Sequence, residues 1–74
     1  MVVTVRLFAS FQQGRFDEAP RECHAGTCVG DIVDELRIPR QEIGVLLVNR
    51  RHAGFDRELS PGDVMSVFPL IGGG

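Results

Sequence analysis

The chain has 74 residues, which is enough for one domain and too few for two. Its hydrophobic content of 43% and charged content of 24% are ordinary for a globular protein, so a disordered chain is not expected. Ten carboxylates against eight cations give a formal charge of −2, and this argues against a nucleic-acid-binding protein, because such surfaces are basic. All eight cations are arginines, so no lysine side chain is present to accept an isopeptide bond.

No segment has the pattern of a targeting signal or a membrane anchor. Arg6 interrupts the apolar opening residues, where a signal peptide would be uncharged. No apolar run approaches the roughly 18 residues of a membrane helix. Cys23 and Cys28 are too few for a disulfide framework. We therefore expect a reduced, cytoplasmic protein that binds no membrane.

Two strands are predicted in the first third of the chain. Apolar and polar residues alternate over residues 2–9, which predicts a half-buried strand. Residues 12–14 have the composition of a turn, and residues 20–25 predict a weaker return strand. The apolar face of the first strand consists of Val3, Val5 and Leu7.

One helix is predicted over residues 28–37, with Thr27 as its N-cap. Its apolar positions recur with helical spacing and form one stripe. We expect Pro39 to end the helix, because proline cannot continue the hydrogen-bond ladder. The stripe consists of Val29, Ile32, Val33 and Leu36.

The second half of the chain predicts two more strands. Residues 43–49 form an apolar run whose length is typical of a strand buried on both faces, so we place it in the middle of a sheet. Residues 60–63 place Pro61 and Gly62 at the two central positions of a type II turn. Residues 64–68 follow as the final strand.

This order of elements predicts an α+β fold. One helix lays its apolar stripe over a mixed sheet of four to five strands, because it cannot cover two faces. The order and the chain length are those of a β-grasp, or ubiquitin-like, roll. We expect one β-grasp domain over residues 1–71 and a flexible glycine tail over residues 72–74.

The three closing glycines have two interpretations. Gly72, Gly73 and Gly74 could be a frayed terminus, because glycine has no side chain to pack. They could instead be a tail that enters a narrow channel in another protein, where any Cβ would clash. The carboxylate of a terminal glycine is ionised at neutral pH.

Motifs in the last third resemble the sulfur-carrier family of β-grasp proteins. The Val48-Asn49 pair is similar to the Val-Asn that follows the family's central strand, and residues 59–63 are similar to its Leu-x-x-Gly-Asp turn. Residues 68–74 resemble its closing Phe-Pro-Pro-hydrophobic-small-Gly-Gly, and residues 5–9 resemble its first strand. The family comprises the small subunit of molybdopterin synthase and the thiamine-biosynthesis sulfur carrier.

Two features favour the molybdopterin branch of this family: the Phe68-Pro69 pair and the long loop before Cys23. The chain departs from the pattern at Leu70, where the family has a second proline. It departs again at Gly72, where alanine, serine or threonine is usual.

The resemblance implies a chemistry for Gly74. An E1-like adenylyltransferase would use ATP to adenylate its carboxylate. A sulfur donor such as a cysteine desulfurase would supply a persulfide, which leaves a thiocarboxylate on Gly74. The large subunit of molybdopterin synthase, or thiazole synthase, would then take the sulfur. The chain would be a co-substrate and not an enzyme, with no bound cofactor or metal.

The resemblance also implies how the tail meets its partners. Gly72 and Gly73 would thread the partner's site. The docking surface would be the segment before them, which we call the tail base: Phe68, Pro69, Leu70 and Ile71. Apolar side chains this near a terminus have few neighbours to cover them, and exposed apolar patches mark interfaces. The alternative is that Phe68 simply belongs to the core.

Other candidate sites are weaker. Zinc ligands could be sought among the cysteines and histidines, but their spacing fits none of the usual paired patterns. Cys28 lies near a helix N-terminus, which could lower its pKa, although a half-buried small side chain is the simpler interpretation. The pair Arg50-Arg51 is interpreted as a solvated hairpin end that could help docking. The zinc candidates are Cys23, His24, Cys28 and His52.

Three alternative functions stay open. The sulfur could go to the thiamine thiazole or to a tungsten-pterin cofactor. The chain could be a ubiquitin-like protein modifier joined to its targets through Gly74. It could also be a non-covalent β-grasp interaction module whose tail is inert.

Overall fold

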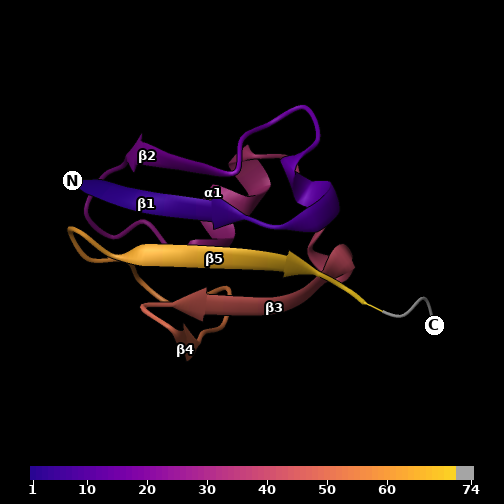
Figure 1. The fold of residues 1–74 in the computed structure, drawn as a ribbon. Coiled ribbons are helices and arrows are strands. Elements are labelled where there is room, and N and C mark those ends of the chain that lie inside the picture. The colour runs from indigo at the N-terminus through magenta and orange to yellow at the C-terminus, as the bar shows by residue number, and fades with distance from the viewer. Residues whose placement is uncertain (72–74) are drawn as a thin grey trace.

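Residues 1–71 form a mixed five-stranded sheet with one α-helix packed across one of its faces (Figure 1). This architecture, taken from a computed structural model that describes residues 1–71, confirms the predicted α+β β-grasp fold. The tail predicted at residues 72–74 lies outside the described residues. The strands are β1 (Val2–Leu7), β2 (Glu18–Glu22), β3 (Ile43–Val48), β4 (Arg51–His52) and β5 (Val64–Pro69), and the helix is α1 (Val29–Glu35). Two short 3-10 helices are η1 (Ala9–Gln12) and η2 (Arg40–Glu42).

The sheet has the order β2-β1-β5-β3-β4, with β5 in the centre (Figure 1). Strand β5 runs parallel to β1 and antiparallel to β3. The return strand β2 begins at Glu18, two residues earlier than predicted, and pairs antiparallel with β1. No helix within residues 1–71 is long and apolar enough to cross a membrane.

The core lies between α1 and the sheet. The alternation predicted for β1 is confirmed, because its odd-numbered apolar residues are buried while Arg6 is exposed. The parallel register places Val5 beside Met65 and Leu7 beside Val67, so β1 and β5 share one buried face. From α1, the side chains with no exposed surface are Val29, Ile32 and Val33.

The start of α1 differs from the prediction by one residue. The N-cap is Cys28 and not Thr27. Asp31, three residues further on, accepts a hydrogen bond from the Cys28 backbone N–H at 2.9 Å. This hydrogen bond is one half of a capping box. It places the N-cap at Cys28, because the acidic residue Asp31 stands three positions later.

The end of α1 also differs from the prediction. The helix ends at Glu35, because Arg37 turns the backbone into the left-handed region with φ +59°. The N–H of Ile38 then bonds to the carbonyl of Val33 at 3.2 Å, which forms a Schellman motif. Ile38 is buried, whereas Leu36 is only partly buried. Leu36 still packs against the core, as the predicted stripe requires, and Ile38, which follows the helix, adds a buried contact that was not predicted.

Strand β3 is buried on one face rather than two. Leu46 and Val48 lie under the helix, but Val45 and Leu47 are only partly buried on the opposite side of the sheet. The middle position in the sheet belongs to β5. Strand β3 is buried on one face because α1 covers only one face of the sheet. We call the other face of the sheet the open face.

The turn before β5 is held by two of the motifs noted in the sequence, Val48-Asn49 and residues 59–63. Gly62 has φ +83°, and the Asp63 N–H bonds to the Ser60 carbonyl at 3.1 Å, as a type II turn requires. The Asp63 carboxylate accepts hydrogen bonds from the Ser60 N–H at 2.8 Å and the Asn49 amide at 2.9 Å. The side-chain Oδ1 of Asn49 accepts from the Val64 N–H at 3.0 Å. These bonds fix the point at which β5 begins.

Candidate functional site

The candidate site is the end of the central strand, where the chain leaves the sheet (Figure 1). Burial falls steeply along this segment: Val67 has no exposed surface, Leu70 is 65% exposed and Ile71 is 90% exposed. Pro69 is the last residue of β5, so Leu70 lies outside the core, as the sequence indicated. Two large apolar side chains are thus presented to solvent at the end of a firmly held strand.

Phe68 lies on the open face and not in the core under the helix. Its ring stacks on that of Phe8, with centroids 4.0 Å apart and planes at 12°. Both rings are partly buried. The Arg6 guanidinium lies 5.2 Å from the centroid of Phe8 and extends this apolar surface with a cation. Phe8 was missed from the sequence, although its alternation with Arg6 already placed it on the outer side of β1.

The base of the tail is fixed by a close approach of two backbones. The Leu70 N–H donates to the Glu42 carbonyl at 2.9 Å, and Pro69 pairs with Ile43. The register shifts at Gly44, where a Cβ would lie 2.9 Å from the Pro69 carbonyl oxygen and 3.1 Å from the Leu70 Cα. Only glycine fits there without a backbone shift. A glycine inside an apolar strand run signals such an approach, so the position of Gly44 in residues 43–49 was the available sequence signal for it.

The tail itself lies outside the described residues. The role of the Gly74 carboxylate and the threading role of Gly72 and Gly73 therefore stay predictions. The described chain ends in an exposed apolar segment that leads directly to them. Such an arrangement can deliver a terminal group to another protein's site.

The thiol at the helix start is not activated. The pKa of Cys28 is raised, first by burial and then by the nearby carboxylates of Asp31, Glu58 and Asp56. This contradicts the lowered pKa that a helix N-terminus would give. Among residues 1–71, no three His, Cys, Asp or Glu side chains are placed to hold a metal ion.

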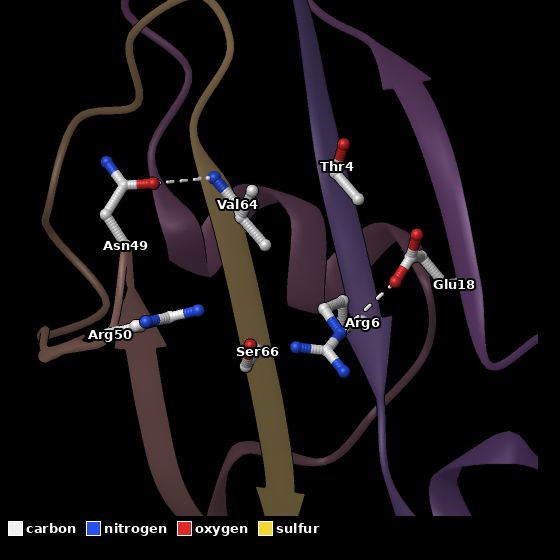
Figure 2. Close-up of a pocket in the computed structure, with 7 residues that line it drawn as sticks. All are labelled: Thr4, Arg6, Glu18, Asn49, Arg50, Val64 and Ser66. Carbon is white, nitrogen blue, oxygen red and sulfur yellow. Dashed lines mark hydrogen bonds and ion pairs between the residues drawn. The ribbon is translucent and has the colours of Figure 1, made fainter.

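A polar groove occupies another part of the open face (Figure 2). Arg50 lies there, in the two-residue loop between β3 and β4, and is solvent-exposed as expected of a hairpin end. The groove has a volume of about 490 Å³. It is lined by Thr4, Arg6, Glu18, Asn49, Arg50, Val64 and Ser66.

The Mut7-C ubiquitin family model matches residues 2–72 of this chain. No curated protein matches the sequence.

Solved structures share this fold over nearly the whole chain. A Pyrococcus furiosus protein described as molybdopterin converting factor, subunit 1, is 30% identical with a TM-score of 0.77, over 96% of this chain and 99% of its own. Small archaeal modifier protein 1 of Haloferax volcanii is 20% identical with a TM-score of 0.77, over 95% and 98%. A chain from the Helicobacter pylori complex of subunits 1 and 2 of molybdopterin-converting factor is 18% identical with a TM-score of 0.68, over 100% of both.

Proposed function

Because this chain belongs to the Mut7-C ubiquitin family, and to the wider β-grasp family of molybdopterin converting factor subunit 1 and the thiamine sulfur carrier, we propose that it is a sulfur carrier. Its Gly74 carboxylate is adenylated and then converted to a thiocarboxylate. The observation that carries the proposal is the tail base: Leu70 and Ile71 are exposed and lead from a central, tightly held strand to three glycines.

The proposed chemistry needs no catalytic side chain on this protein. The Gly74 carboxylate attacks the α-phosphate of ATP on an E1-like adenylyltransferase, and pyrophosphate leaves. A persulfide from a donor such as a cysteine desulfurase attacks the acyl carbon, so that AMP leaves and an acyl disulfide forms. A second thiol cleaves the sulfur–sulfur bond, which leaves the thiocarboxylate and an oxidised donor disulfide.

The proposed acceptor of the sulfur is the pterin precursor of the molybdenum cofactor. The 30% identity to the Pyrococcus furiosus converting-factor subunit supports this choice over the thiamine thiazole. The partner would be a large subunit of molybdopterin synthase, in the way that subunit 1 assembles with subunit 2 in the Helicobacter pylori complex.

A second candidate function is protein modification. The likeness to small archaeal modifier protein 1 favours it, because that protein has the same fold over nearly its whole length. The same activated Gly74 would then pass to a lysine of a target protein. This chain has no lysine, so it could not form polymers through its own side chains.

Intact-mass analysis of the protein from its native host tests the proposal. A sulfur carrier shows the mass gain of one oxygen-to-sulfur replacement at a chain that ends in Gly74. A modifier shows discrete heavier conjugates. An unmodified mass under conditions of active cofactor synthesis, or a native chain that continues past Gly74, contradicts the carrier proposal.

A further inference from the structure

The polar groove on the open face has a charge opposite to that of the whole protein. It lies over the first half of β5, at Val64 and Ser66 (Figure 2). Two cations, Arg6 and Arg50, and one carboxylate, Glu18, line it, which gives a local charge of +1 against −2 for the chain. Thr4, Asn49 and Ser66 add neutral polar groups. The groove is therefore suited to an anion.

Arg50 is held at the edge of the groove by the hairpin between β3 and β4. It is the second residue of the two-residue loop between β3 and β4, and its φ of +69° lies in the left-handed region. Asn49 before it has φ +52°, so the two residues have the paired positive φ values of a type I′ hairpin turn. The Arg50 guanidinium makes no hydrogen bond or ion pair with another of residues 1–71. The side chain is therefore exposed at the rim of the groove and available to a partner.

Arg6 and Ser66 complete the groove from the adjacent strands. The register places Arg6 beside Ser66, and Figure 2 shows the side chains of Arg6 and Arg50 on the two sides of Ser66. The ion pair of Arg6 with Glu18 is made through Nε at 3.2 Å, with both side chains about half exposed. A guanidinium has five N–H donors, so this single contact leaves Arg6 with donors for another anion.

We propose that this groove docks an acidic segment of a protein partner, with a carboxylate held between Arg6 and Arg50. Planar guanidinium groups match a carboxylate well. A protein partner is favoured over a free anion because the groove adjoins the apolar Phe8–Phe68 stack, which Arg6 also contacts. An aromatic patch with a polar border is the usual composition of a protein interface. The inference does not depend on the chemistry of the tail.

An NMR titration of the full chain with a capped pentaglutamate peptide tests the inference, with inorganic phosphate at equal ionic strength as the second arm. The peptide should give saturable shifts at Arg6, Arg50 and Ser66 and should bind more tightly than phosphate. Arg50→Gln should lower the association constant about fivefold, the upper range for an exposed charge pair. Glu18→Gln should raise it about threefold, because it frees Arg6 and removes a like charge.

Arg51→Gln is the matched control, because it removes the same charge from the neighbouring exposed residue, which does not line the groove. It should change the association constant by less than about twofold. The inference is overturned if Arg51→Gln weakens binding as much as Arg50→Gln, if Glu18→Gln has no effect, or if phosphate binds more tightly than the peptide. Unchanged amide shifts outside the groove establish that each variant is folded.

Discussion

Val67 and Ile71 are only four residues apart, yet Val67 has no exposed surface and Ile71 is 90% exposed. Val67 sits under α1 in the central strand, where burial of such a side chain contributes about 1.5–3 kcal/mol to stability. Ile71 gains almost none of this within its own chain. The difference teaches that the core fixes β5, while the apolar side chains that follow it gain no such burial within residues 1–71.

The largest loss of stability should come from a change in the core that buries Val67, and Ile32→Ala is such a change. Ile32 has no exposed surface under the sheet, so the change should cost about 2–5 kcal/mol. A domain of this size has roughly 5 kcal/mol of stability, so the variant should be close to unfolding. Leu36→Ala should cost clearly less, because Leu36 is only partly buried. Urea denaturation followed by circular dichroism checks this, and equal losses would contradict the assignment of the core.

Gly44→Ala should disturb the tail base more than the core. The added Cβ would meet the backbone of Pro69 and Leu70, and such overpacking costs about 1–3 kcal/mol. We expect the Leu70–Glu42 hydrogen bond to be lost, and with it the hydrogen-exchange protection of the Leu70 amide. Gly54→Ala is the control, because its Cβ would meet only the mobile end of the Asp56 side chain. An equally protected Leu70 amide in Gly44→Ala would show that Gly44 does not set the tail base.

Leu70→Asp should weaken partner binding with little effect on stability. Leu70 is 65% exposed, so the melting temperature should hardly change. The affinity for the adenylating enzyme should fall at least about tenfold, or 1.4 kcal/mol. Val2→Asp places the same charge at another exposed apolar residue, near the other end of the sheet. Titration calorimetry in which both variants bind as tightly as the natural chain would remove Leu70 from the interface.

The smallest effect should be a pH dependence from Asp63. The hydrogen bond from the Ser60 N–H, followed by that from the Asn49 amide, holds the pKa of Asp63 below its usual range. A lowered folded-state pKa means that the stabilisation is present above the unfolded value of about 3.9 and is lost as the pH falls through the folded value. Asp63→Asn should therefore lose less stability than the natural chain between about pH 4 and pH 2. The free energy of unfolding of both chains is measured by urea titration at each pH. If it fell equally with pH in both chains, this assignment would be contradicted.

The sequence predicted the elements that follow a simple period. Val3 and Val5 alternate with polar residues, and Ile32 and Val33 recur with helical spacing, so their burial could be read directly. The type II turn at Gly62 was also predictable, because proline and glycine specify it locally.

What the sequence did not predict depends on contacts between distant residues. Arg37 adopts a left-handed conformation at a position where glycine is usual, so the end of α1 and the burial of Ile38 were missed. The close approach at Gly44 and the Phe8–Phe68 stack depend on strand register, which periodicity alone does not fix. The candidate tail could be predicted because three successive glycines are an unusual composition. The contacts that fix its base, at Gly44 and between Leu70 and Glu42, could not.

Adenylation of a chain extended by one alanine after Gly74 tests the central claim most directly. The tail base is already exposed, so the extra residue should leave the circular dichroism spectrum and the melting temperature unchanged. If the free carboxylate of Gly74 is the working group, ATP–pyrophosphate exchange with the adenylating enzyme should be abolished while the natural chain reacts. Exchange at the natural rate with the extended chain would contradict the account.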